Sequence, residues 1–310
     1  MTPASSEFNV VTVTLNPAID RTITIPHFTP GAVNRVRQSR DTAGGKGVNV
    51  AAALAGNGHH VAVTGFLGSE NTRLFEALFA EKQISDQFIR IAGETRVGIK
   101  IVDPVQGTTT DINFPGFSPT AGEIAAFWEK IEALDAEWFV LGGSLPLGME
   151  PAIYRDLTTR LKTKGRKVVV DASDEALRHA IEAGPTVIKP NVHELEALLG
   201  KPLRDEGEVI DAARKLVNQG IELVAVSMGK EGACFANGEG AVIARPPALE
   251  VLSAVGAGDA MVAGIVAAQL RGLSLEECAR VATAFSVQAL SGCNLATAME
   301  RVTHTPHRAC

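Results

Sequence analysis

Short apolar segments typical of buried strands alternate with helical segments along most of this 310-residue chain. The strand-like segments are residues 10–15, 61–66, 139–141, 168–171, 187–189 and 223–227. The helical patterns cover residues 48–55, 74–82, 124–134, 153–164, 195–199 and 209–219, and the last part of the chain is expected to be helical, at 259–270 and 275–290. Such alternation predicts a parallel sheet that is covered by helices on both faces.

Two stretches interrupt this alternation, because in them strand-like segments follow one another without a helix between them. Residues 22–25 are expected to pair with 33–41, and residues 97–102 are expected to form a hairpin with 108–114. Their polar alternation is typical of strands that are exposed on one face. We therefore predict a single domain over residues 1–310 with a discontinuous β-sheet lid, formed by about 20–42 and 95–116.

The composition excludes several classes of protein. A hydrophobic fraction of 45% supplies a sizeable core, and a net charge of −6 is opposite in sign to that of a generic nucleic-acid binder. The longest apolar stretch, near residues 261–270, is too short to cross a bilayer. The four cysteines include no Cys-x-x-Cys pair, which favours reduced thiols in a cytoplasmic protein. We expect neither a nucleic-acid partner nor a membrane partner.

Many of the 30 glycines lie in clusters that follow predicted strands or precede predicted helices. These clusters are at residues 44–47, 142–143, 229–232 and 256–258. Ligands of parallel α/β proteins bind beyond the carboxyl ends of the strands, where glycine lets the backbone come close to them. An acidic chain can therefore still bind small anions in a local site at this edge of the sheet.

Gly256-Ala257-Gly258-Asp259 begins a predicted helix and carries the most chemistry of these clusters. Backbone N–H groups at the start of a helix attract an anion, and Asp259 lies in the first turn beside them. Phosphoryl transfer needs such a pair, because donors bind the charge of the γ-phosphate while a carboxylate accepts a hydroxyl proton. The alternative is that Asp259 only complements the helix dipole. The sequence has no P-loop, no protein-kinase signature and no Gly-x-Gly-x-x-Gly after the first strand.

Other polar residues near predicted strand ends have a structural and a functional interpretation. Glu194 follows Asn191 by three residues, so the two form either a helix-capping box or part of a nucleotide site in which Glu194 holds Mg²⁺ through water. Asp20 either stabilises a turn or accepts hydrogen bonds from sugar hydroxyls. The cations that either lie at the surface or hold a substrate phosphate are Arg35, Lys46 and Arg96.

Nine short motifs occur in order along nearly the whole chain. They are TLNPAID at 14–20, TAGGKGVNVA at 42–51, GFLG at 65–68, GETRVGIK at 93–100, TDINFPGF at 110–117, GSLP at 143–146, KPNVHE at 189–194, SMGKEG at 227–232 and VGAGD at 255–259. This set resembles the ribokinase-like (phosphofructokinase B) sugar kinases, and within them most resembles the bacterial 1-phosphofructokinases. The resemblance implies a three-layer α/β/α sandwich with a mostly parallel central sheet and a small β-sheet lid.

The same resemblance implies ATP-dependent phosphorylation of fructose 1-phosphate to fructose 1,6-bisphosphate, with Asp259 as the general base. The backbone anion hole would be formed by Gly256, Ala257 and Gly258. The implied sugar-phosphate site contains Asp20, Asn34, Arg35, Gly44, Gly45, Lys46, Asn49, Arg96, Ser144 and Asp259. The implied ATP site contains Lys189, Asn191, Ser227, Gly229, Gly232, Val255, Gly256, Ala257, Gly258 and Asn294. Glu194 would organise Mg²⁺, and a monovalent cation such as K⁺ is a further expected ligand. The resemblance also implies a homodimer that forms through the lid.

Two alternatives remain open at this point. A tagatose-6-phosphate kinase or a 6-phosphofructokinase of the same family would use the same site. A catalytically silent sensor of a sugar phosphate or a nucleotide is the alternative from a different class. It is suggested by Ala254 and Ala260, which stand where the family usually carries hydroxyl side chains.

Overall fold

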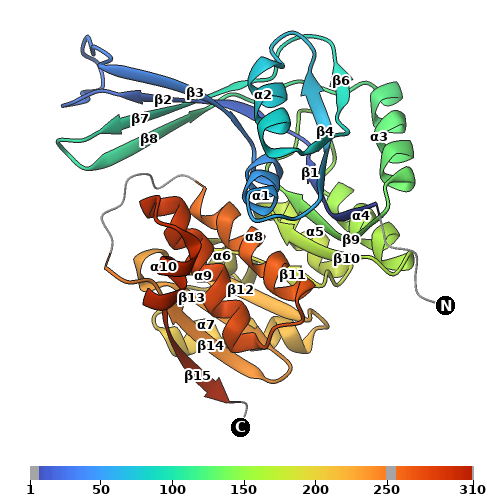
Figure 1. Ribbon diagram of the computed structural model, residues 1–310, viewed down its shortest axis with the longest axis vertical. Helices are drawn as coiled ribbons and strands as arrows, with labels where there is room; N and C mark the ends of the chain where they lie inside the picture. Colours follow the sequence, from blue (N-terminus) through green and yellow to red (C-terminus); the bar gives the residue numbers. More distant parts are fainter. Residues whose placement is uncertain (1–6, 249–255, 309–310) are drawn as a thin grey trace.

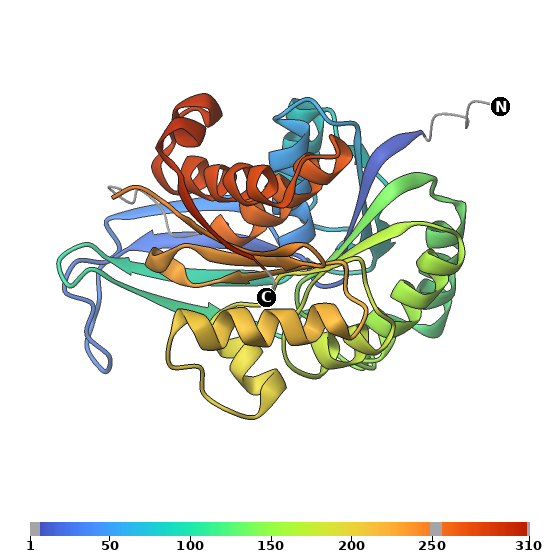
Figure 2. The ribbon, with the colours of Figure 1, turned by 90° about the horizontal axis from the view of Figure 1, so that it is seen from below.

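The computed structural model describes residues 7–248 and 256–308 and places them in a central sheet between two layers of helices (Figure 1). Figure 2, turned by 90°, shows the sheet edge-on with helices above and below it. The predicted α/β/α arrangement is therefore confirmed. Within the described residues, no helix combines the length and the apolar character that crossing a membrane requires.

The central sheet has 11 strands in the order β15-β14-β13-β12-β11-β10-β9-β1-β4-β5, with β6 paired to β4. The strands are β1 (Phe8–Thr14), β4 (Val61–Gly68), β5 (Ser85–Asp86), β6 (Ile89–Ile91), β9 (Ala136–Gly142), β10 (Lys167–Asp171), β11 (Val187–Ile188), β12 (Leu223–Ser227), β13 (Ala233–Asn237), β14 (Gly240–Arg245) and β15 (Thr303–Arg308). Strands β12 to β5 of this order pair in parallel, whereas β13, β14 and β15 form an antiparallel edge. Strand β1 lies between β4 and β9, so the chain order reverses there, and α/β proteins bind ligands at such a point.

Two hydrophobic cores separate the sheet from its helical layers. One layer contains α1 (Lys46–Ala55), α2 (Arg73–Lys82), α8 (Ala257–Leu270), α9 (Leu275–Ser291) and α10 (Leu295–Arg301). The other contains α3 (Ala121–Ala133), α4 (Ile153–Thr163), α5 (Asp174–Glu182), α6 (Val192–Leu199) and α7 (Glu206–Asn218). Successive side chains of a strand point to opposite faces, so Val10 of β1 belongs to the first core and Val11 to the second.

Helix α8 is buried on all sides from Asp259 to Ala268. Its close packing against α9 depends on a missing side chain, because a Cβ on Gly264 would lie 2.6 Å from the Cα of Ala282. The hydroxyl of Ser286 in α9 also donates a hydrogen bond of 2.8 Å to the carbonyl of Ala257. The first turn of α8 is therefore held firmly against α9.

A second, four-stranded sheet extends from the body of the molecule (Figure 1). Its order is β3-β2-β7-β8, and its strands are β2 (Ala18–Thr24), β3 (Gln38–Gly44), β7 (Val97–Asp103) and β8 (Thr108–Asn113). We call residues 18–44 and 97–114 the flap. The register places Asp20 opposite Gly98 and Lys100 opposite Asp111, so these four residues share one face of the sheet. The small sheet that the sequence predicts is confirmed.

The structure also corrects some predicted elements. Pairing was expected over residues 33–41, but β3 begins at Gln38, because Asn34 holds a turn by donating to the carbonyls of Thr29 and Ala32. The helices predicted at 259–270 and 275–290 are confirmed as α8 and α9, but the chain then continues through α10 into the edge strand β15, which was not predicted. The other elements that the sequence reading omitted are α5, α10, β5, β6, β13 and β14. Asn237-Gly238, at the end of β13, is a hairpin signal that could have revealed the last two.

Candidate active site

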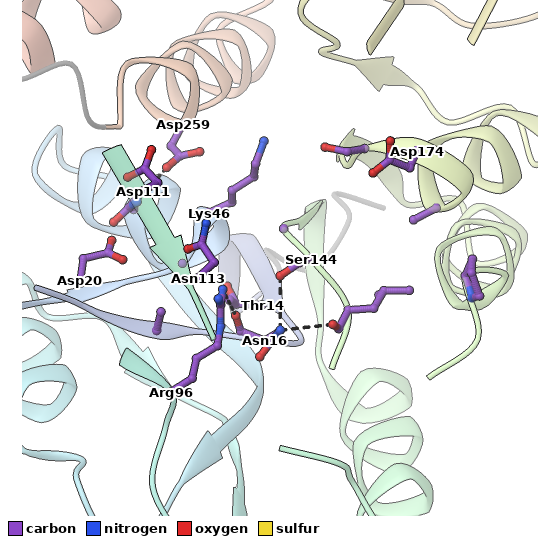
Figure 3. A pocket seen from close by; sticks show the side chains of 18 of the residues that line it. Thr14, Asn16, Asp20, Lys46, Arg96, Asp111, Asn113, Ser144, Asp174 and Asp259 are labelled. Carbon is purple, nitrogen blue, oxygen red and sulfur yellow. Dashed lines mark hydrogen bonds between the residues drawn. The ribbon is translucent and has the colours of Figure 1, made fainter. Parts of the chain in front are cut away.

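A pocket of about 650 Å³ lies where the carboxyl ends of β1, β9 and β10 face the flap (Figure 3). Residues from the starts of α1, α5 and α8 complete its walls. The pocket therefore collects side chains that are far apart in the sequence. The residues of the predicted sugar-phosphate site that line it are Asp20, Gly45, Lys46, Asn49, Arg96, Ser144 and Asp259.

Asp259 enters this pocket from the first turn of α8. Asn49 of α1 donates a hydrogen bond from Nδ2 to Oδ2 of Asp259 at 2.7 Å. Only 9% of Asp259 is exposed. Burial, and in second place the negative charge of Asp171, raises the pKa of Asp259 to about 6. Such a carboxylate is ionised at neutral pH and is a stronger base than an ordinary aspartate, as proton abstraction requires.

The start of α8 supplies backbone donors next to Asp259. Gly256 precedes the helix with a φ of 80°, a left-handed conformation that favours glycine. The N–H groups of a first helical turn have no acceptor within the helix, so those of Ala257 and Gly258 can bind an anion. Val255, also predicted for the ATP site, lies outside the described residues, as does Ala254.

The turn that precedes α1 is packed too closely for side chains. A Cβ on Gly44 would lie 2.2 Å from Oδ2 of Asp20. Gly45 has a φ of 113°, and a Cβ there would lie 2.8 Å from Cγ2 of Thr14. These two glycines therefore let α1 begin at the pocket, where Lys46 and Asn49 line its wall.

Two lysines share one buried carboxylate beside the pocket. Nζ of Lys46 lies 2.8 Å from Oδ1 of Asp171, and Nζ of Lys189 lies 3.4 Å from the same oxygen. Burial alone would raise the pKa of Asp171, but the two ammonium groups outweigh it and lower that pKa. Burial opposes the charge of Lys46 as well, but the carboxylate of Asp171 raises its pKa on balance. Asp171 and Lys46 are therefore both charged at neutral pH.

The flap contributes a second group of charges to the pocket. Burial raises the pKa of Asp20, although the charges of Lys100 and Arg96 oppose the shift. Nζ of Lys100 lies 2.5 Å from Oδ1 of Asp111 on the neighbouring strand. Arg96 is held in place by hydrogen bonds of 3.0 and 3.2 Å to two backbone carbonyl groups. This side of the pocket can bind hydroxyl groups through Asp20 and a phosphate through the two cations.

Asn16 joins the base of the flap to the loop that carries Ser144. Its Nδ2 lies 3.3 Å from Oγ of Ser144 and 3.2 Å from the carbonyl oxygen of Leu145 (Figure 3). The same nitrogen lies 3.1 Å from the carbonyl oxygen of Pro115, directly after the flap. The position of Ser144 at the pocket is thereby tied to that of the flap.

Half of the ten residues predicted for the ATP site gather at the carboxyl ends of β11 and β12. Lys189 follows β11, and Asn191 forms an isolated β-bridge with Ser227 at the end of β12. Gly229 and Gly232 lie in the next turn with φ values of 62° and 98°, where glycine is favoured. The structure thus brings these five residues to the same edge of the sheet as the pocket.

Glu194 has the structural role that its spacing from Asn191 suggests. The Asn191 side chain accepts a hydrogen bond from the N–H of Glu194, and Oε2 of Glu194 accepts one from the N–H of Asn191, which is a capping box for α6. Oε1 of Glu194 accepts a hydrogen bond of 2.7 Å from Ser173. The carboxylate is therefore oriented toward the end of β10, where it could contact a hydrated Mg²⁺. Among the described residues, no three His, Cys, Asp or Glu side chains cluster as a metal-binding group.

Three residues predicted for the site lie elsewhere in the described structure. Asn34 and Arg35 line a separate hollow formed by residues 25–37 of the flap, so the structure does not bring them to the pocket of the same chain. Asn34 is engaged with Thr29 and Ala32. Asn294 is exposed and caps α10, and its contact with ATP stays a prediction.

Several pocket residues were missed by the sequence reading. Lys100, Asp111 and Asn113 lie on the same face of the flap as Asp20, and the alternation of β7 and β8 could have revealed them. Asp171 ends an apolar strand without a glycine cluster beside it, so the strongest signal used for the other loops is missing there.

Comparison with known proteins decides the family. Residues 13–300 match the profile described as pfkB family carbohydrate kinase. A 1-phosphofructokinase from Rhodobacter capsulatus is 49% identical over 284 residues, covering 91% of this chain and 90% of that protein. The chain belongs to the pfkB family of carbohydrate kinases. A 1-phosphofructokinase of Escherichia coli strain K12 is 39% identical to this kinase over 292 residues, covering 92% of both chains.

Solved structures share the fold of this kinase. Phosphofructokinase-2 from Escherichia coli in complex with substrates and products has a TM-score of 0.88 at 28% identity, covering 94% of this chain and 98% of that one. A possible 1-phosphofructokinase from Thermotoga maritima has a TM-score of 0.84 at 29% identity, covering 96% and 99%. The predicted ribokinase-like fold and the phosphotransferase class are therefore confirmed.

Proposed function

We propose that this kinase transfers the γ-phosphoryl group of ATP to fructose 1-phosphate, giving fructose 1,6-bisphosphate and ADP. The observation that carries the proposal is the position of Asp259. Its buried carboxylate lines the pocket from the first turn of α8 and accepts a hydrogen bond from Asn49. The choice of sugar is supported by relatives named 1-phosphofructokinase, which are 39% and 49% identical over most of the chain.

In the proposed reaction Asp259 accepts the proton of the hydroxyl on carbon 6 of the sugar phosphate. The hydroxyl oxygen forms a bond to the γ-phosphorus while the bond from that phosphorus to the bridging oxygen of ADP breaks. The pKa of Asp259 near 6 lets it take the proton at neutral pH and release it afterwards. The N–H groups of Ala257 and Gly258 stabilise the negative charge of the group in transit.

The sugar phosphate is proposed to lie beneath the flap. Asp20 accepts hydrogen bonds from sugar hydroxyls, and the Gly44 turn packs against the Asp20 carboxylate. Arg96 and Lys100 offer charge-assisted hydrogen bonds to the phosphate on carbon 1. Ser144 completes the opposite wall. This arrangement leaves the acceptor hydroxyl to face Asp259.

ATP and Mg²⁺ are proposed to bind along the edge that carries Lys189, Asn191, Ser227, Gly229 and Gly232. Mg²⁺ commonly keeps several waters and uses one or two carboxylates together with substrate phosphates, and Glu194 fits that demand. The bound Mg²⁺ would neutralise phosphate charge.

Potassium also remains a proposed ligand. A structure of phosphofructokinase-2 from Escherichia coli has been solved in complex with potassium. Measuring kcat as a function of K⁺ concentration tests whether this kinase also binds K⁺.

The flap is proposed to join two copies of the kinase. Exposed apolar strands need cover, and contiguous apolar patches mark interaction sites. The large apolar side chains that the described residues expose are Val33, Val36, Val105, Ile112, Phe114 and Leu147, and all except Leu147 belong to the flap. Phosphofructokinase-2 from Escherichia coli has a tetrameric inhibited form, so oligomers occur in the family.

We also propose that the kinase is located in the cytoplasm. Its four cysteines include no Cys-x-x-Cys pair, which favours reduced thiols.

A coupled assay with Mg-ATP tests the choice of substrate. Fructose 1-phosphate, fructose 6-phosphate and tagatose 6-phosphate are compared under identical conditions, and fructose 1-phosphate is expected to have the highest kcat/KM. If another sugar phosphate has the highest value, the proposed substrate is wrong while the kinase chemistry stands. If none of the three is turned over but one binds, the sensor alternative replaces the proposal.

A further inference from the structure

Asp171 occupies a position that the proposed mechanism has not used. It ends β10, and only 1% of its side chain is exposed. Its Oδ1 lies 2.8 Å from Nζ of Lys46 and 3.4 Å from Nζ of Lys189. Its Oδ2 is buried and has no hydrogen-bond partner within the described part of the chain. One carboxylate therefore holds two ammonium groups through a single oxygen.

The two ammonium groups come from opposite sides of the site. Lys46 begins α1 and lines the pocket proposed for the sugar phosphate. Lys189 follows β11 beside the start of α8, because a Cβ on Gly258 would lie 3.5 Å from its Nζ. Asp171 thus links the cation on the sugar side to the cation beside the anion-binding helix end.

This cluster is not explained by stability. Buried ion pairs contribute little, because the cost of removing the charges from water can exceed their mutual attraction. Two ammonium groups around one carboxylate carry one positive charge among these three side chains, and the nearby carboxylate of Asp259 offsets it until Asp259 takes up the proton of the acceptor hydroxyl. That surplus suits an anion arriving between the two lysines, and the long lysine side chains would otherwise be free to point elsewhere.

We propose that Asp171 is a positioning residue for phosphoryl transfer, which aims Lys46 and Lys189 at the phosphoryl group as it passes from ATP to the sugar. The proposal rests on the proposed function, because it needs a phosphoryl group to move between the two lysines. Lys46 donates a hydrogen bond to Asp171 and Lys189 forms an ion pair with it, so each ammonium group keeps N–H donors for phosphate oxygens. Fixing both cations before substrates bind avoids reorganisation during the reaction.

The same carboxylate acts on the base. The charged groups that influence Asp259 are Asp171, Lys46 and Lys189, and of these only Asp171 raises its pKa. Removing the charge of Asp171 should therefore lower the pKa of Asp259. The acid limb of the pH profile of kcat is the range in which turnover falls because Asp259 becomes protonated. A residue that only supports the fold would not shift this limb to lower pH.

The decisive experiment measures Asp171→Asn against wild type and against Asp135→Asn, which removes a surface carboxylate paired with Arg166. The assay uses whichever sugar phosphate the wild type prefers, so failure of the substrate assignment does not affect it. We expect kcat to fall about 10- to 100-fold with each KM within about threefold, as loss of a preorganised contact implies. The acid limb of kcat should move to lower pH, and Asp135→Asn should match wild type.

Three results would overturn the proposal: a kcat within twofold of wild type, an unmoved acid limb, or full recovery at raised Mg²⁺, which would make Asp171 a metal residue. Because Asp171→Asn leaves Lys46 and the buried Lys189 without their partner, it can fail to fold. The double variant Asp171→Asn with Lys189→Met keeps one ammonium group. The kcat of the double variant should be lower than that of Lys189→Met alone, because Asp171 no longer positions Lys46. Equal kcat values for the two variants would also contradict the proposal.

Discussion

The two sides of the pocket are built differently. The edge of the central sheet holds Asp259, Asp171 and Lys189 almost fully buried, and each is fixed by partners on another element. The flap side holds Asp20 and Lys100 on a thin sheet with Arg96 directly before β7, and apolar side chains of this sheet such as Ile112 are exposed to 45%. The sheet-edge side is buried within a single chain, whereas the flap side leaves apolar surface exposed.

This difference suggests a division of labour. Transfer of a phosphoryl group depends on charges held in fixed positions away from water, which the sheet edge provides. Recognition of a particular sugar phosphate is proposed to depend on the shape and charge of the flap, which is a separate sheet from the central one. Variants on the sheet edge should therefore reduce kcat, and variants on the flap should change sugar affinity or assembly.

The largest expected effect is that of Asp259→Asn on turnover. An amide cannot accept the hydroxyl proton, and a positioned base contributes about 10²–10⁴-fold, so kcat should fall at least about 100-fold. Binding of ATP, measured by calorimetry, should stay within about threefold because the backbone donors of α8 remain. Asp211→Asn, on the exposed side of α7, serves as the control and should match wild type. Near-normal turnover would show that Asp259 is not the base.

The same substitution should stabilise the protein at neutral pH. Burial raises the pKa of Asp259 from 3.8 to about 6, so the folded state binds this proton more tightly than the unfolded chain does. The group's contribution to stability is therefore full below about pH 4 and is lost as the pH rises to about 6. At about pH 7.5 Asp259→Asn should raise the free energy of unfolding by up to about 3 kcal/mol. Urea unfolding measures this, and a less stable variant at that pH contradicts it.

A smaller effect is expected from Asp20→Asn on the flap. The charge of Asp20 strengthens its hydrogen bonds to sugar hydroxyls, so its loss should raise the KM for the sugar phosphate about tenfold. The KM for ATP should change less than about twofold, since Asp20 lies on the other side of the pocket. Steady-state kinetics with each substrate varied in turn will measure both constants. If only the KM for ATP changes, Asp20 acts on ATP and not on the sugar phosphate, and its proposed role is wrong.

The smallest effect on the chemistry is expected from Ile112→Asp, which should instead change assembly. A charge within the exposed apolar face of the flap should shift the kinase toward monomers in analytical ultracentrifugation. Leu147→Asp is the matched control, because Leu147 is exposed to a similar degree outside the flap, 52% against 45%. If both variants sediment like wild type, the flap does not join the two copies.

The sequence was most informative where backbone geometry demands particular residues. Gly256 and Gly258 revealed the start of α8 and, with it, Asp259, because an anion-binding helix end needs small residues. The alternation of strands and helices similarly revealed the central sheet. The Asn191–Glu194 spacing predicted a capping box that the structure contains.

Residues whose roles depend on tertiary contacts could not be found in this way. One lysine partner of Asp171 lies 125 residues before it and the other lies directly after the adjacent strand β11, and no local pattern encodes that meeting. Arg35 was assigned to the sugar site, but the turn held by Asn34 places it in a different hollow of the flap. The edge strand β15 is polar and contains Pro306, so neither periodicity nor propensity indicated it.

A crystal structure of Asp259→Asn with fructose 1-phosphate and Mg-ATP tests the central claim most directly. The variant should keep both substrates unreacted. The hydroxyl on carbon 6 should lie within about 3.2 Å of the side chain at position 259, with the sugar phosphate against Arg96 and Lys100. A sugar phosphate bound in another hollow, or an acceptor hydroxyl that faces away from position 259, would contradict the proposed site.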